Sequence, residues 1–165
     1  MPLLLADDPP DRPAWIAETI RLLAAVTDEC RVALLGRVAA AEPAELAAGT
    51  DADWGLGQVA THLLVVERAV ALIGLRLARG EAAGPTGQAR PAPGEASRAS
   101  LEVLAAKAES ALVRLRREFP ASPDMSATAR HPYYGALNCF GWLLLLPNHY
   151  RAHLAALDTG RPSAL

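Results

Sequence analysis

The chain has 165 residues and a formal net charge of −2, which suits a single domain spanning 1–165 with a sizeable buried core. Hydrophobic residues make up 52% of the sequence but aromatic residues only 5%, so the composition favours helices and offers little material for a sheet. The slight negative charge excludes the strongly basic surface expected of a protein that binds nucleic acid or an anionic membrane.

The N-terminal segment, the longest apolar run and the cysteines are the features of the sequence that bear on the cellular compartment. The N-terminal segment MPLLLADDPP lacks a basic region and a small-residue cleavage site, so we expect no signal peptide. The longest apolar run, near Trp142 to Leu146, is far shorter than a membrane span. Cys30 and Cys139 fall on different predicted helices, and we expect both to be reduced thiols in a cytoplasmic protein.

Four stretches are predicted to be amphipathic helices, because their apolar residues recur every three or four positions. The second helix is capped at Asp53 or Gly55, and with Gly55 as the cap Gln58 stands at the capping-box position. The first helix ends before Pro43, because proline disfavours a helical conformation in the residue that precedes it. The predicted bounds of the four helices are 12–41, 56–79, 96–119 and 135–158.

The stretch GEAAGPTGQARPAPG, from Gly80 to Gly94, is dense in glycine and proline and has no helical period. We expect it to be mobile and long enough to cross the end of a bundle, so the helices on either side need not be antiparallel neighbours. The predicted fold is therefore all-α: a four-helix bundle with a long crossover between the second and third helices.

Three histidines carry the argument for function. His62 lies within the apolar stripe of the second helix, and His149 and His153 lie four residues apart near the end of the fourth. That spacing puts the last two on one helix face, roughly 6 Å apart along the axis. Three buried imidazoles without a shared partner would leave polar nitrogens unsatisfied, and a divalent cation would satisfy them. The sequence thus predicts a metal site with an open coordination position.

Each histidine also has a plainer interpretation. A single histidine in an apolar stripe is commonly a hydrogen-bonded core residue, and pairs four residues apart also arise on exposed helix ends. Pro147 is expected to kink or bulge the fourth helix two residues before His149. Such a kink would either aim His149 at the metal or turn it away.

Other side chains near the predicted site are interpreted as packing residues. His131 precedes His149 by 18 residues, roughly 27 Å in a continuous helix, which favours a capping or packing role over a substrate-facing one. The same interpretation applies to Trp54, Tyr133 and Tyr134.

Helix geometry separates three more candidates from the histidines. Tyr150 points about 100° away from His149. Glu67 follows His62 by five residues and lies about 140° round the helix, off the buried stripe, which disfavours it as a general base but leaves an outer contact open. Cys139 lies about 15 Å from His149 along the helix, too far to share one coordination sphere.

The segments GLGQVATHLLVVERA, after Trp54, and HPYYGALNCFGWLLLLPNHYRAH resemble the DinB/YfiT-like family of metal-dependent enzymes, over most of the chain. The shared features are a histidine early in the second helix, an HP-aromatic-G segment opening the fourth, and an HxxxH pattern near its end. The resemblance implies a four-helix bundle with a long crossover, forming a homodimer, in which His62, His149 and His153 bind zinc, nickel or a similar ion. It also implies a low-molecular-weight thiol cosubstrate, as in the transferases and isomerases among the relatives.

Three classes of function stay open at this point. The first is a metalloenzyme that acts on a small molecule by thiol transfer or hydrolysis, because three neutral ligands leave the ion's charge uncompensated and one position free. The second is a non-catalytic dimeric bundle in stress response, and the third is a module that binds a small ligand in the bundle cavity. Metal content with and without added ions separates the first from the second.

Overall fold

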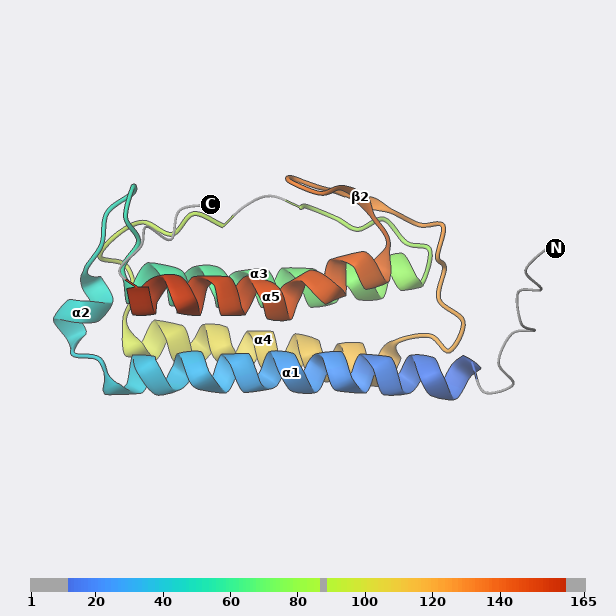
Figure 1. The fold of residues 1–165 in the computed structure, drawn as a ribbon, viewed down its shortest axis with the longest axis horizontal. Helices are drawn as coiled ribbons and strands as arrows, with labels where there is room; N and C mark the ends of the chain where they lie inside the picture. The colour runs from blue at the N-terminus through green and yellow to red at the C-terminus, as the bar shows by residue number, and fades with distance from the viewer. Residues whose placement is uncertain (1–11, 87–88, 160–165) are drawn as a thin grey trace.

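The computed structural model describes residues 12–86 and 89–159 as a mostly helical protein, as the composition predicts (Figure 1). The described elements, in chain order, are α1 (Arg12–Ala40), α2 (Pro43–Ala47), α3 (Leu56–Ala78), α4 (Arg98–Glu118), β1 (Ala129–His131), β2 (Gly135–Leu137) and α5 (Cys139–Thr159).

The first three predicted helices are confirmed to within two residues at each end as α1, α3 and α4. Their caps explain the agreement. The backbone N–H of Gly55 donates to Gln58 Oε1 at 3.2 Å before α3, and Ser97 Oγ accepts from the Ser100 N–H before α4. The connection after α1 contains a short helix that was not predicted, α2, where the Glu42 N–H donates to Glu45 Oε2.

The predicted start of the last helix at Gly135 is wrong. Residues 129–137 instead form an antiparallel hairpin, with Ala129 paired to Leu137 and His131 to Gly135. Gly135 has a φ of +75°, a left-handed conformation that suits glycine and breaks a helix. The helix begins at Cys139, where Asn138 Oδ1 accepts a hydrogen bond from the Gly141 N–H.

The four long helices lie alongside one another, and α3 packs against both α4 and α5 (Figure 1). Each contributes leucines that are almost fully buried: Leu34, Leu63, Leu101 and Leu146. Gly74 allows close approach of α3 and α5, since a Cβ there would lie 2.7 Å from Leu143 Cγ. Among the described residues, α3 is the helix with the length and apolar composition of a membrane span, but 61% of its most apolar window is buried, as in a core helix.

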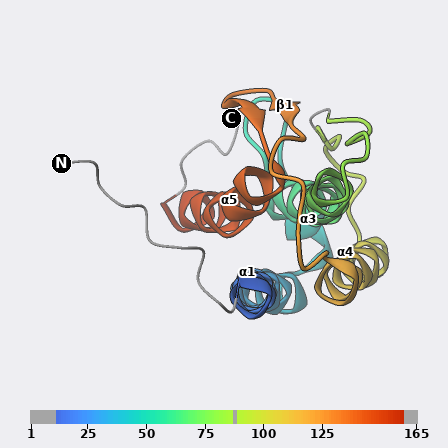
Figure 2. The same ribbon diagram turned by 90° about the vertical axis from the view of Figure 1, so that its right-hand side faces the viewer.

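The direction of the helices determines where the connections run. The colours in Figure 1 show that α3 and α4 run the same way, and that α1 and α5 run the opposite way. The chain between α3 and α4 therefore returns along the length of the molecule, as a parallel pair requires. This crossover and the hairpin lie on the side of α3 and α5 that faces away from α1 and α4 (Figure 2). That side carries the candidate site.

Candidate metal centre

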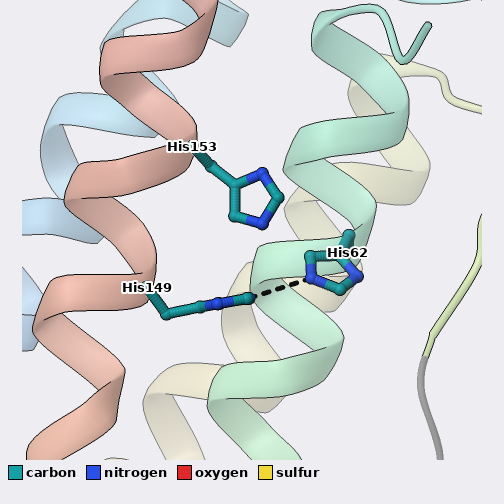
Figure 3. Close-up of side chains that lie close together, drawn as sticks. All are labelled: His62, His149 and His153. Atoms are coloured by element: carbon teal, nitrogen blue, oxygen red, sulfur yellow. Dashed lines mark hydrogen bonds between the residues drawn. The ribbon is translucent and has the colours of Figure 1, made fainter. Parts of the chain in front are cut away.

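The three predicted histidines meet between α3 and α5. His62 points from α3 toward His149 and His153, which stand one turn apart on α5 (Figure 3). One ring nitrogen of each lies within 4.8 Å of the others, and the ring centroids are 4.7–5.0 Å apart. The three histidines are thus close enough to hold one metal ion.

Pro147 does not turn His149 away from the cluster. Helix α5 continues through Pro147, which is buried, and His149 Nε2 lies 2.9 Å from His62 Nε2. Of the two outcomes considered for this proline, the structure shows the one that brings His149 to the site.

The crossover fixes the orientation of His62. Its Nδ1 lies 2.7 Å from the carbonyl oxygen of Ala89, which can only accept, so Nδ1 carries the proton. The lone pair of Nε2 then faces the other two histidines, and His149 Nε2 donates to it. One turn earlier on α3, Gln58 Nε2 donates to the carbonyls of Pro91 and Thr50. Two side chains of α3 therefore hydrogen-bond to the crossover, His62 to the carbonyl of Ala89 and Gln58 to that of Pro91.

The cluster has an unsatisfied nitrogen. His153 is 3% exposed, and its Nε2 is the buried side-chain polar atom without a hydrogen-bond partner among the described residues. Leaving such an atom without a partner costs about 1–3 kcal/mol. A metal ion shared by the three rings would remove that cost, so the donor set fits the predicted ion.

Burial keeps the three imidazoles neutral, as metal ligands must be. It lowers the pKa of His149 to about 3, helped by the neighbouring His153 and His62, and that of His153 to about 4. Burial also lowers the pKa of His62, while the hydrogen bond to the Ala89 carbonyl acts in the opposite direction. At neutral pH all three rings are therefore in the neutral form, each with one ring nitrogen protonated.

Trp54 packs against the histidine cluster as well as against the hydrophobic core. Its ring centroid lies 5.0 Å from that of His62, and it stacks on His153 at 6.4 Å with the ring planes 7° apart. The packing role predicted for Trp54 is confirmed, and its partners include the histidines themselves.

A cavity of about 410 Å³ adjoins the histidines, a volume typical of small-molecule sites. Its floor comes from α3 and α5, one wall from the crossover and another from the hairpin. Most of the lining is apolar, including Val66, Ile73 and Leu146, and the described lining contains no carboxylate.

The position predicted for His131 rested on a continuous helix and is wrong. Because the chain turns back at the hairpin, His131 lines the same cavity as His149. It also packs, with ring centroids 4.8 Å from Trp142 and 4.9 Å from Tyr134, and its Nδ1 accepts from the Tyr133 N–H. The position of His131 therefore allows the substrate-facing role that the sequence analysis disfavoured. Tyr133 and Tyr134 line the cavity beside it.

Glu67 is fully buried, although the sequence placed it off the buried stripe. Its carboxylate accepts a hydrogen bond from Tyr150 at 2.5 Å and pairs with Arg31 of α1, which also pairs with Asp28. Tyr150 is therefore a buried structural residue whose hydroxyl binds Glu67 and not the histidine cluster. The signal available in the sequence was Arg31 beside Cys30 on the inward face of the first helix, but the pairing joins residues 36 positions apart.

Cys30 and Cys139 are both buried free thiols, and burial raises the pKa of each. Neither belongs to the group of side chains able to hold a metal ion. Cys30 is part of the hydrophobic core, where it packs as a small apolar residue.

No family model, curated protein or solved structure matches this chain.

Proposed function

We propose that this protein is a metal-dependent enzyme in which His62, His149 and His153 hold one divalent transition ion beside a small-molecule cavity. The observation that carries the proposal is the unsatisfied Nε2 of His153, buried among imidazoles that are neutral and close enough to share an ion. Zinc and nickel are the preferred candidates, because neutral imidazole suits both. An ion bound there would supply a Lewis acid that lowers the pKa of water or a thiol in its open position.

The finer fold assignment belongs to the same proposal. The long helices and the crossover after α3 support a four-helix bundle of the DinB/YfiT-like kind, as the sequence resemblance implies. The resemblance also supports a homodimer, which light scattering of the purified protein would detect as twice the mass of the chain.

The protein's own residues orient the donors. The Ala89 carbonyl holds the proton of His62 on Nδ1 and so presents the Nε2 lone pair to the site. The hydrogen bond to His62 places the proton of His149 on Nε2. For the same atom to hold an ion, the neutral ring would carry its proton on Nδ1 instead. Trp54, stacked on His153, restricts the rotation of the third ring.

The cavity favours thiol transfer over hydrolysis. Thiol transfer needs no strong protein base once the thiol is deprotonated, and the described lining contains no carboxylate to act as one. Hydrolysis also needs a group that moves a proton to the leaving group. His131 is the imidazole of the described lining outside the three donors, which keeps hydrolysis as the second reaction.

A non-catalytic ligand-binding module is the second candidate function. The observation that favours it is the cavity itself, whose apolar lining and volume suit a small molecule with or without turnover.

The test is metal content followed by turnover. Untagged protein supplemented with zinc or nickel is expected to hold about one ion per chain, and His149→Ala and His153→Ala to lose most of the affinity. Full metal retention in both variants would refute the site. Loaded protein is then incubated with cellular thiols plus electrophiles, and separately with esters and amides.

Metal-dependent turnover that disappears in His62→Ala supports an enzyme and selects between the two reactions. Stoichiometric metal without turnover in either panel favours the binding module. No metal after supplementation favours the non-catalytic dimer.

A further inference from the structure

The cavity beside the histidines contains a cation that the proposed reaction does not use. Arg90, on the crossover, lines the cavity and makes no hydrogen bond or ion pair with any other described residue. Other described arginines pair with a carboxylate, as Arg37 does with Asp158 and Arg79 with Glu118. A guanidinium at a cavity without such a partner is available to a ligand.

The backbone on both sides of Arg90 is fixed. The carbonyl of Ala89 accepts from His62, and that of Pro91 accepts from Gln58, which is 1% exposed. Two buried side chains of α3 thus hold the residues that flank Arg90. The position of its Cα relative to the histidines is set by the same contacts that orient a metal donor.

The chemistry of the lining indicates what Arg90 would bind. The described lining contains apolar and aromatic side chains, four histidines, the neutral polar residues Thr86 and Asn148, and Arg90 as its one permanent charge, with no aspartate or glutamate. An anionic group entering this cavity meets no repulsive carboxylate, and an attached apolar body can pack against Trp142 and Tyr134. A single arginine forms the planar fork that matches a carboxylate, whereas phosphate sites usually gather several N–H donors at a helix N-terminus or glycine-rich loop.

We propose that the cavity binds small carboxylic acids with an apolar body, and that Arg90 is the residue that recognises the carboxylate. The orientation of the ligand, with its reacting end at the histidines, rests on the proposed metal site; the carboxylate preference does not. This assigns a substrate class, an apolar monocarboxylate, to a cavity whose substrate is otherwise undefined.

The test compares two probes of one shape, 4-phenylbutyrate and 4-phenylbutanamide, by quenching of tryptophan fluorescence in the full-length protein. Trp54 and Trp142 both line the cavity and report on occupancy. We expect wild type to bind the carboxylate about five-fold more tightly than the amide, as an exposed ion pair allows. In Arg90→Gln the ratio should fall to about one, with the affinity for the amide unchanged.

Arg130→Gln is the matched control. It removes the same charge from an exposed residue of the hairpin that does not line the cavity, so the five-fold ratio should persist. The preference in wild type should also shrink as ionic strength rises from about 0.05 M to about 0.5 M.

Both zinc-loaded and EDTA-treated protein are titrated, because a carboxylate could also bind a metal directly. A carboxylate preference that persists in Arg90→Gln overturns the proposal, and so does failure of the carboxylate to bind wild type. If EDTA-treated wild type keeps an Arg90-dependent preference while the zinc site proves absent, the carboxylate site stands and the metal site falls. Zinc binding without any carboxylate preference gives the opposite result.

Discussion

Two buried polar clusters share helices α3 and α5 but differ in how their hydrogen-bonding groups are satisfied. The Arg31 cluster, formed by Asp28, Arg31, Glu67 and Tyr150, pairs each buried charge with an opposite charge or a hydroxyl. The histidine cluster, formed by His62, His149 and His153, leaves a buried nitrogen without a partner and opens onto a cavity. The first cluster is complete within the protein and joins α1 to α3 and α5. The second is incomplete without something from outside, which is the mark of a binding site.

The largest expected effect on stability comes from removing one charge of the Arg31 cluster. Glu67→Ala leaves Arg31 buried with only the half-exposed Asp28 as a partner. We expect the free energy of unfolding to fall by about 3–5 kcal/mol, the usual loss when one member of a buried pair is removed. Urea denaturation followed by circular dichroism measures it. A loss below about 1 kcal/mol would mean that the Arg31 cluster does not stabilise the packing of α1.

Zinc binding to the histidine cluster should stabilise the protein by a comparable amount. Zinc at one hundred times its dissociation constant should raise the free energy of unfolding by about 2.7 kcal/mol. The increment should vanish in His62→Ala, which removes one of the donors. Tyr150→Phe, one residue from His149 but in the other cluster, should retain it. Equal zinc stabilisation of His62→Ala and wild type would contradict the assignment of donors.

A smaller loss is expected from Tyr150→Phe alone. The substitution removes the hydroxyl that donates to Glu67 and leaves Arg31 in place. We expect destabilisation of about 2 kcal/mol, the range for a hydrogen bond to a charged group. Zinc affinity measured by competition with a chelator should be unchanged. A joint loss of stability and zinc affinity would show that the two clusters are coupled through α5.

The smallest effect is the pH dependence of the metal-free protein. Folding lowers the pKa of His149 to about 3 and of His153 to about 4, so between pH 6.5 and about 4.5 the unfolded chain binds more protons. Their contribution to stability is present above pH 6.5 and is lost as the pH falls below it. The double variant His149→Gln/His153→Gln should show a shallower fall over this window in thermal unfolding. An identical slope in the variant would mean that the two histidines are not held neutral by folding.

The difference between the clusters also explains what could be predicted from the sequence. Helices with a periodic apolar stripe and a local cap, such as Leu56–Ala78 with Gly55 and Gln58, depend on neighbouring residues and were predicted nearly to their ends. The meeting of His149 with His153 followed from helix geometry. Their meeting with His62 followed only from the assumption that all three face inward.

Long-range features were missed for physical reasons. Glu67 was taken as solvent-facing because its partner Arg31 lies on another helix, and only the folded packing brings the charges together. The strands of the hairpin have three residues each, too few to show an alternating pattern, so residues 135–137 were taken as helical. The distance from His131 to His149 was then estimated along a continuous helix. The missed hairpin made the expected distance from His131 to His149 too long, so His131 was placed away from a cavity that it lines.

The division of the cavity between helices and connections has a consequence for how this protein could change. The three candidate metal donors stand on the packed helices α3 and α5. Residues 132–134 and 89–90, which also line the cavity, belong to connections between elements. Loops tolerate substitution far better than packed helices do. A library that randomises the hairpin tip and Arg90 would therefore sample new ligand preferences while leaving the helix positions of the donors unaltered, so the same centre could serve different molecules through small edits to two short stretches of chain.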